Sequence, residues 1–168
     1  MTQTPASHAS SASKPTIYLD DLAVGDQFTS GEHAMDEAQI TAFAAQFDPQ
    51  PFHLDDAAAR ATLFGGLAAS GWHTAGIVMR MMCDGFILDS SSLGSPGLDS
   101  LKWHKPVLVG DALRARMTVL DSRPMKSKPH VGLVQTRWEA LNQRDEIVMT
   151  IESWAMFGRR TPGAAVTG

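Results

Sequence analysis

A short proline-rich stretch of the chain holds the residue types that acid–base chemistry needs. Asp48 and His53 lie five positions apart, and two of the residues between them are prolines. A proline excludes the helical conformation from the residue before it, so Asp48 and Gln50 are expected in a stiff, extended segment. A carboxylate and an imidazole held towards one point could share a water molecule, one group removing a proton while the other delivers one. An imidazole can do either near neutral pH.

The same residues also have a purely structural interpretation. Asp-Pro at a helix end is common turn chemistry, and a single histidine near a helix start is more often a surface or capping residue than a catalyst. His53 and Asp55 could also be two metal ligands, but no third ligand follows at a matching spacing, so we expect no metal site. Spacing alone therefore leaves both interpretations open.

A second feature is the pair Ser70-Gly71, which immediately precedes a strongly apolar segment. The free N–H groups of a helix's first turn, with the positive end of the helix dipole, stabilise negative charge that develops on a carbonyl oxygen. Gly71 would let a substrate approach the backbone closely. The alternative is that Ser70 is an ordinary N-cap of an ordinary core helix.

Helical patterns surround these candidate residues. One helix is expected from Asp36, as N-cap, to Phe47, and a shorter one from residue 55 or 56 to the glycines at 65 and 66. The segment Trp72–Cys83 is apolar on nearly every side and is expected to be a central helix enclosed on all sides. Gly71 and Gly76 would let a neighbouring backbone approach that helix.

After residue 97 the hydrophobic period changes to two. Strands are expected at residues 98–104, 113–119, 131–142 and 147–157, with a further one near 27–35. Twelve strand residues span about 40 Å and twelve helical residues about 18 Å, so the strands must curl around the helix. This predicts an α+β architecture with a curved antiparallel sheet wrapped around one long central helix. Pairing two copies would protect the sheet edges, so we expect a homodimer or a dimer-based oligomer.

The composition is that of a single compact domain. The chain has 168 residues, of which 43% are hydrophobic and 19% charged. Residues 1–16 and 161–168 have too few large apolar side chains to offset the entropy of ordering, and we expect them to be loose tails. The expected domain covers residues 17–160.

Charge and cysteine content limit the partners and the compartment. The net charge is −4 and is spread without long blocks of one sign, so neither nucleic acid nor a membrane is expected as a partner. Cys83 is the single cysteine, which fits a reducing compartment. No apolar run is long enough to span a membrane and no hydrophobic signal core begins the sequence, so a cytoplasmic location is expected.

The chain resembles the MaoC-like dehydratases, relatives of the R-specific enoyl-CoA hydratases, from about residue 18 to 157. The motifs that carry the resemblance are Phe47-Asp48-x-x-Pro51-x-His53-x-Asp55, Phe64, Ser70-Gly71 before an apolar helix, and Leu101-Lys102-Trp103-His104-Lys105-Pro106-Val107-x-x-Gly110-Asp111. It implies the hotdog fold, which is a curved sheet around a long central helix. It also implies reversible hydration of an acyl-CoA thioester, with no cofactor beyond the CoA ester itself.

Roles for individual residues follow from the same resemblance. Asp48 and His53 correspond to the pair that binds and activates the water, and the Gly71 N–H to the donor to the thioester oxygen. Ser70 stands where relatives commonly have histidine, and it could bond the loop that carries Asp48. Weaker candidates for substrate binding are Gln50, Phe52, Trp72, Arg123, Lys126 and Lys128. The last three belong to a basic loop at 123–129, which could meet the phosphates of CoA or be a solvated hairpin tip.

Two other functions fit the same fold. An acyl-CoA thioesterase is the first, because a fold alone does not fix a function. Thioesterases of this architecture tend to place a carboxylate along the central helix, and Trp72–Cys83 has none, which favours a hydratase. A non-catalytic acyl-CoA-binding protein is the second. It stays open because Pro49 and Gln50 depart from the family pattern, which usually has asparagine before the second proline.

Overall fold

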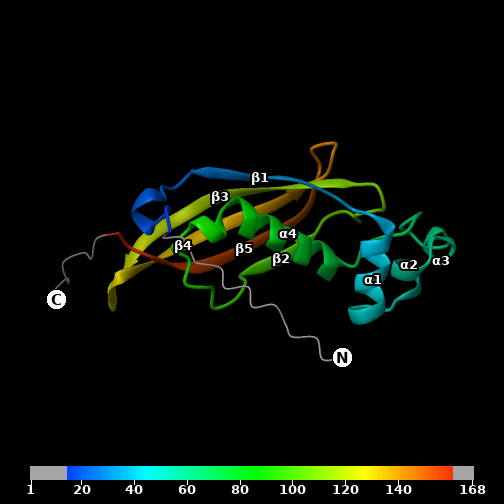
Figure 1. The fold of residues 1–168 in the computed structure, drawn as a ribbon, viewed down its shortest axis with the longest axis horizontal. Helices are drawn as coiled ribbons and strands as arrows, with labels where there is room; N and C mark the ends of the chain where they lie inside the picture. Colours follow the sequence, from blue (N-terminus) through cyan, green and yellow to red (C-terminus); the bar gives the residue numbers. More distant parts are fainter. Residues whose placement is uncertain (1–14, 161–168) are drawn as a thin grey trace, which may run out of the picture.

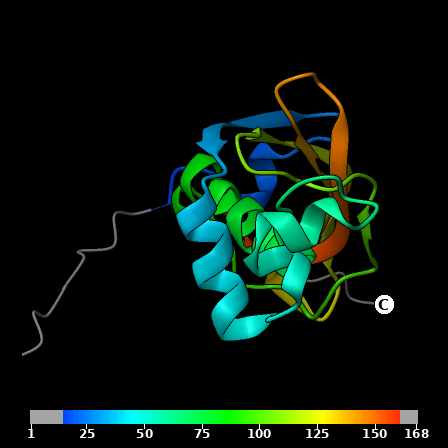
Figure 2. The same ribbon diagram turned by 90° about the vertical axis from the view of Figure 1, so that its right-hand side faces the viewer.

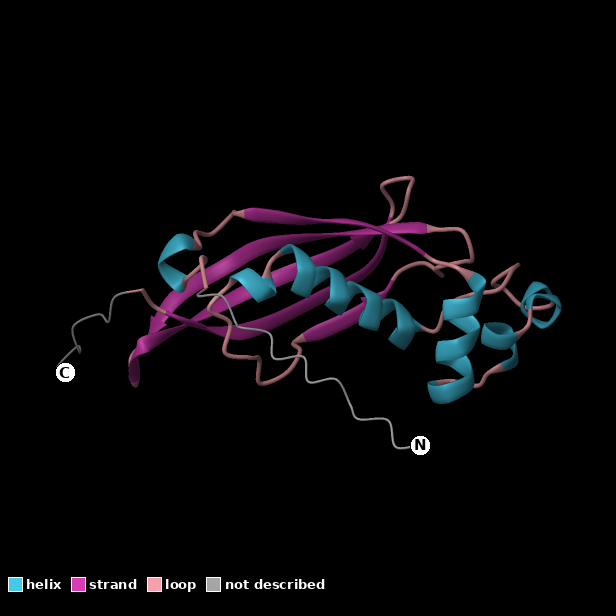
Figure 3. Ribbon diagram, in the orientation of Figure 1, coloured by secondary structure: helices cyan, strands magenta, loops and turns pink. Residues whose placement is uncertain are grey.

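The computed structural model describes residues 15–160, which form a curved antiparallel sheet with one long helix against its concave face (Figure 1). The predicted tails lie outside this range except for residues 15 and 16, and the Thr16 N–H donates to the Asp89 carbonyl at 2.8 Å. Figure 3 separates the two layers by colour, with the strands behind the helix. The predicted α+β architecture is confirmed.

Within the part of the chain that the structure describes, the sheet has five strands in the order β1-β3-β4-β5-β2, and all neighbours are antiparallel. Inward side chains of β3 alternate with outward ones, as the period of two predicts. Viewed from one end, the sheet curves around the helix (Figure 2). The strands are β1 Gln27–Ala34, β2 Ser100–Trp103, β3 Ala112–Met125, β4 Lys128–Leu141 and β5 Ile147–Gly158.

The strands β3 and β4 extend further than the sequence predicts. The predicted basic loop at 123–129 is mostly strand, because only residues 126 and 127 form the turn between them. Pro124 pairs with Gly132 beside a register shift, and such an irregularity allows a proline within a sheet. The loop is therefore a tight hairpin.

Residues 15–160 contain four α-helices: α1 Glu37–Phe47, α2 Pro51–Leu54, α3 Asp56–Arg60 and α4 Gly71–Gly85. Short 3-10 turns occupy Leu19–Asp21 and Ile87–Asp89. The N-cap predicted for α1 is present, since the Asp36 side chain accepts a bond from the Gln39 N–H. The sequence did not predict α2, which begins at Pro51 because proline is tolerated in a helix's first turn. The helices α1, α2 and α3 gather beyond the N-terminal end of α4 (Figure 1).

The expectation that the central helix is enclosed on all sides is wrong for the single chain. The rest of the chain covers one side of α4, where the buried residues are His73, Thr74, Val78, Met81 and Met82, and the His73 ring stacks on Phe43 of α1. The other side leaves Trp72 61% exposed and Met79 49% exposed. A Cβ at Gly76 would meet no atom within 4 Å, so no backbone approaches there. One sheet can cover only one face of a helix, and the second apolar face is left without a partner from this chain.

Candidate active site

Asp48 is placed by the end of α1. Its N–H still donates to the Ala44 carbonyl at 2.9 Å, but its own φ of −149° and ψ of 68° leave the helix. These angles are not extended, so the extended conformation predicted for Asp48 is wrong, because this residue still closes the last turn of α1. Pro49 follows, and Gln50 is extended as predicted. This geometry directs the Asp48 carboxylate towards the start of α4, where Ser70 Oγ donates to Oδ2 at 2.7 Å. Gln50 Nε2 donates to Oδ1, also at 2.7 Å.

These two hydrogen bonds set the ionisation of Asp48. The bond from Ser70 and then the bond from Gln50 hold the pKa of this carboxyl below its ordinary value, and partial burial offsets them only in part. Hydrogen bonds to the charged form favour it. Asp48 is therefore a carboxylate at neutral pH and can accept further hydrogen bonds but cannot donate one.

His53 is buried in α2 and has a defined tautomer. Its Nδ1 lies 2.8 Å from the Ala68 carbonyl oxygen, which can only accept, so Nδ1 carries the hydrogen. In the neutral ring Nε2 then has the free lone pair, and it lies 3.5 Å from Asp48 Oδ2. The ring of Phe52 packs edge-on against the imidazole with centroids 4.6 Å apart. His53 thus presents a base towards the Asp48 carboxylate.

The N-terminus of α4 completes the cluster. Ser70 is its N-cap, is fully buried, and accepts from the Trp72 N–H at 3.2 Å while donating to Asp48. Gly71 is the first helical residue, so its N–H has no acceptor within the helix. The structure therefore brings Asp48, His53, Ser70 and Gly71 together, and the bond from Ser70 to the loop of Asp48 is present.

Asp48, His53 and Gly71 line one cavity of about 490 Å³, and Ser70 lies buried behind them. Among the predicted substrate-binding residues, Gln50, Phe52 and Trp72 lie in its wall. The wall also contains residues of the family motifs to which the sequence assigns no role: Phe64, Trp103, His104, Lys105, Pro106 and Val107. For all of these except Phe64, the signal in the sequence is Pro106, which predicts a strand end close by; the chain after it lies beside the entry to α4, where the Ala69 N–H donates to the Val107 carbonyl at 2.8 Å.

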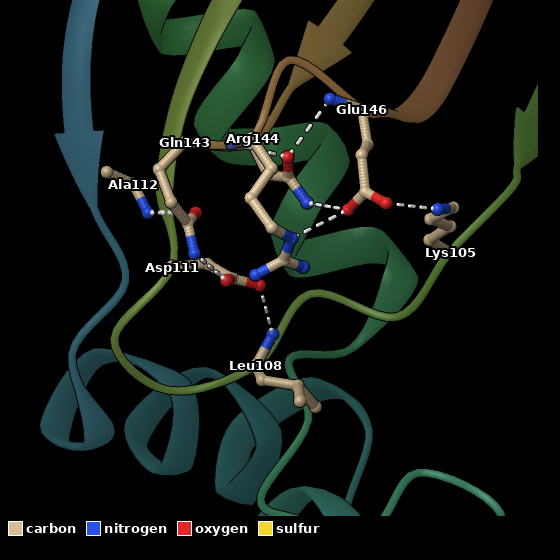
Figure 4. A network of polar contacts seen from close by, with 8 residues as sticks. Lys105, Leu108, Asp111, Ala112, Gln143, Arg144 and Glu146 are labelled. Atoms are coloured by element: carbon tan, nitrogen blue, oxygen red, sulfur yellow. Dashed lines mark hydrogen bonds and ion pairs between the residues drawn. The ribbon is translucent and has the colours of Figure 1, made fainter.

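A polar network fixes the loop that carries His104 and Lys105 (Figure 4). Lys105 Nζ donates to Glu146 Oε1 at 2.6 Å, and Asp111 accepts from the Leu108 N–H at 2.9 Å and from Gln143 Nε2 at 2.8 Å. Bonds from Asn142, Lys105 and Arg144 lower the pKa of Glu146 to about 2. The turn between β4 and β5 thus anchors one wall of the cavity.

The basic residues predicted to meet CoA phosphates lie elsewhere in the chain. Arg123, Lys126 and Lys128 belong to the hairpin between β3 and β4, at the opposite end of the sheet from α1, α2 and α3 (Figure 1). Arg123 lies over the Trp154 ring at 4.5 Å. Within one chain these cations do not line the cavity of Asp48 and His53.

Neither a metal cluster nor a membrane helix is found in the described part of the chain. Within residues 15–160, no three His, Cys, Asp or Glu side chains are grouped to hold a metal ion. None of the helices in that range is both long and apolar enough to cross a membrane.

A curved sheet around α4, with a polar cluster at the first turn of that helix, defines a hotdog protein. The chain belongs to the family of the MaoC like domain, whose model matches residues 22–142. It is 47% identical to the MaoC-like dehydratase from Rhodospirillum rubrum, with a TM-score of 0.81 over 86% of this chain and 99% of that one. The (R)-hydratase from A. caviae involved in PHA biosynthesis is 26% identical, with a TM-score of 0.58 over 82% of this chain and 98% of that one. A segment of 63 residues is 38% identical to mesaconyl-CoA hydratase of Cereibacter sphaeroides, covering 38% of this chain and 18% of that protein.

Proposed function

We propose that the protein catalyses the reversible addition of water to the 2,3-double bond of an enoyl-CoA thioester, giving the (R)-3-hydroxyacyl-CoA. The observation that carries the proposal is the grouping of an ionised carboxylate, an imidazole lone pair and a helix N-terminus around one cavity. Membership of the MaoC-like family and the likeness to the (R)-hydratase from A. caviae support it. The R configuration is assigned from that likeness.

Binding in this proposal polarises the thioester. The carbonyl oxygen accepts a hydrogen bond from the Gly71 N–H at the positive end of α4. This arrangement withdraws electrons from C3 and prepares a site for the negative charge of the enolate. Fixed donors of this kind typically contribute about 10²- to 10³-fold to kcat.

The acid–base pair then acts on one water molecule. The Asp48 carboxylate accepts one hydrogen of the water and orients it, while His53 Nε2 takes the other proton as the oxygen attacks C3. The C3–O bond forms, and the π electrons move to the thioester oxygen. His53 becomes an imidazolium, whose charge Asp48 stabilises.

Collapse of the enolate completes the reaction. The electrons return to C2, which takes the proton from His53 Nε2, and both groups are restored. Asp48 is unsuited to this proton transfer because its pKa is held below the ordinary value. Because one imidazole handles both transfers, water adds to one face of the double bond. Dehydration is the reverse sequence, and no step requires a cofactor.

The other two functions have less support. Asp84 follows the apolar part of α4 but is paired with Arg80 at 2.7 Å near the far end of the helix from Gly71, so no carboxylate of α4 lines the cavity. This geometry disfavours thioester hydrolysis. Gln50 stands where the family usually has asparagine, but its side chain still donates a hydrogen bond to the Asp48 carboxylate. This substitution therefore gives no reason to assume a non-catalytic binding protein.

The proposal is tested by measuring hydration of crotonyl-CoA by the wild type and by Asp48→Asn and His53→Gln. Each substitution should lower kcat by about 10²- to 10⁴-fold, the usual effect of removing an acid–base group. The matched controls Asp84→Asn and His130→Gln change exposed residues outside the cavity and should stay within about twofold of wild type. Unchanged hydration in both site variants, or release of free CoA without hydration, would contradict the proposal.

A further inference from the structure

The side chain of Trp103 lies directly on the first turn of α4. Trp103 ends β2, the strand at one edge of the sheet, and its Nε1 donates to the Gly71 carbonyl oxygen at 2.9 Å. A Cβ built on Gly71 would lie 2.6 Å from Trp103 Cε2 and 2.8 Å from Nε1. The indole thus fills the space that any side chain at position 71 would need. A larger residue at position 71 would force the indole or the backbone to shift. The group beside Gly71 is therefore a side chain, where the sequence predicted a neighbouring backbone or the substrate.

This contact belongs to the cavity wall and not to the core. Trp103 is 45% exposed, and it meets the exposed Trp72 ring edge-on at 5.5 Å and 80°. Both rings line the cavity that contains Asp48 and His53. The ring is about half in solvent, and its N–H is bonded to a helix terminus. Two of its contacts restrain the backbone of Gly71: the hydrogen bond from Nε1 to the carbonyl oxygen and the packing of the ring against the Cα.

We propose that Trp103 is a positioning residue, which fixes the peptide groups of Gly71 so that the N–H points at the thioester oxygen. This inference rests on the role proposed above for Gly71. A glycine is the most mobile of residues, and a first-turn residue has no hydrogen bond from its N–H to the helix. A donor stabilises a developing charge only if it is already oriented. The hydrogen bond from Trp103 Nε1 to the Gly71 carbonyl and the packing of the indole against the Gly71 Cα supply that restraint. The preceding residue, Ser70, is held by its own hydrogen bond to Asp48.

A double-mutant cycle of Gly71→Ala and Trp103→Ala measures the coupling between these two residues, with kcat and KM for the hydration of crotonyl-CoA as the readout. Gly71→Ala should lower kcat by about 10²-fold, as does the loss of an oriented donor, because the new Cβ displaces the backbone or the indole. In a Trp103→Ala background the new Cβ has space, so Gly71→Ala should lower kcat by less than about fivefold relative to Trp103→Ala alone. Trp103→Phe keeps a ring without the N–H and should lower kcat about fivefold with KM within twofold, the effect of one hydrogen bond.

Two controls separate this effect from general damage. Trp154→Ala removes an indole outside the cavity, and Gly66→Ala adds a Cβ that meets no atom closer than 3.8 Å, so both should stay within about twofold of wild type. If Trp103→Ala fails to fold, as judged by circular dichroism, Trp103→Leu replaces it in the cycle.

The inference is overturned if the cycle is additive, that is, if Gly71→Ala lowers kcat by the same factor in the wild type and in the Trp103→Ala variant. A rise in KM with unchanged kcat for Trp103→Phe would also overturn it, because the indole would then be only a wall for the substrate. Either result in an active wild type leaves the proposed function intact. A wild type that hydrates no enoyl-CoA removes the proposed function and this inference together.

Discussion

Ser70 is the residue on which the candidate site depends most. Its hydroxyl donates to Asp48, and its oxygen also accepts from the Trp72 N–H, so a single side chain caps α4 and supports the carboxylate. The two functions are coupled because the same atom makes both bonds. The orientation of the helix terminus relative to Asp48 is therefore fixed by one short contact.

Replacing Ser70 by alanine should change both the pH profile and the stability. Loss of the Ser70 bond, the largest cause of the lowered pKa of Asp48, moves that pKa up towards 3.8. Since Asp48 must be ionised to orient water, any acidic limb due to Asp48 in kcat/KM should move to higher pH. Loss of the N-cap should cost about 1 kcal/mol of unfolding free energy. A pH–rate profile and urea unfolding measure the two effects.

The comparison for this variant is Ser122→Ala on β3, a serine outside the cavity. It should leave the pH profile unmoved and change the unfolding free energy by less than about 0.5 kcal/mol. A Ser70→Ala enzyme with the wild-type pH profile would mean that Asp48 does not depend on this hydroxyl.

Part of this site could be predicted from single residues. The prolines predict that Asp48 and Gln50 are both extended. Gln50 is extended, with φ of −80° and ψ of 139°, whereas Asp48 leaves the helix with a ψ of 68° that is not extended. The contact of Trp103 with Gly71 could not be predicted, because it joins residues 32 positions apart and hydrophobic period does not say which ring meets a given glycine. Such contacts follow from tertiary packing and not from local pattern.

Among the elements, the turn between β4 and β5 has the most distinctive electrostatics. Glu146 accepts from Lys105, Asn142 and Arg144, so this turn holds the loop after β2 in place. Because that loop contributes His104 and Lys105 to the cavity, the network links the edge of the sheet to the site.

Glu146→Gln should lower stability at neutral pH but not in strong acid. The pKa of Glu146 is about 2 in the folded chain against an ordinary 4.5. A lowered carboxyl pKa stabilises the fold above the ordinary value, and the contribution is lost as pH falls from 4.5 to 2. Urea midpoints of wild type and variant should thus differ at pH 7 and converge near pH 2.

The control is Glu32→Gln, which changes an exposed carboxylate of β1. The difference in urea midpoint between the wild type and this variant should not disappear as the pH is lowered from 7 to 2. An equal difference between wild type and Glu146→Gln at both pH values would show that the network does not stabilise the charged form of Glu146.

Helices and strands could be predicted where the hydrophobic pattern of the sequence is regular, but the positions of their ends could be predicted less well. The alternation in β3 and the N-cap of α1 are confirmed. In β5 the alternation is interrupted at its start, where Val148 and Met149 are both buried beside a register shift in the pairing with β4. The strands around Pro124 continue past the expected boundary because a register shift accommodates the proline. The short helix α2 was missed since four residues carry no helical period.

At the scale of the whole molecule, the exposed side of α4 is the unexplained surface. Trp72 and Met79 lie there, and β2 leaves one edge of the sheet unpaired within the described residues. The sequence correctly predicts the class of fold. Its prediction that α4 is fully enclosed fails because hydrophobicity shows that a surface is covered without showing which chain covers it.

We expect a second copy of this chain to cover that face. Met79→Glu places a charge in the middle of it and should shift the protein from twice the chain mass towards the single chain in sedimentation velocity. Leu63→Glu alters a leucine that is 91% exposed and lies before α4, and it should leave the mass unchanged. A wild type that sediments as one chain at micromolar concentration would contradict the expected dimer.

The central claim is that water is added at C3 and not at the thioester carbonyl. The most direct measurement is incubation of the wild type with crotonyl-CoA in water labelled with heavy oxygen, followed by mass spectrometry of the product. The expected product is an intact CoA thioester that carries the label in a hydroxyl group at C3. Label in a free carboxylate together with released CoA thiol, or no incorporation at all, would contradict it.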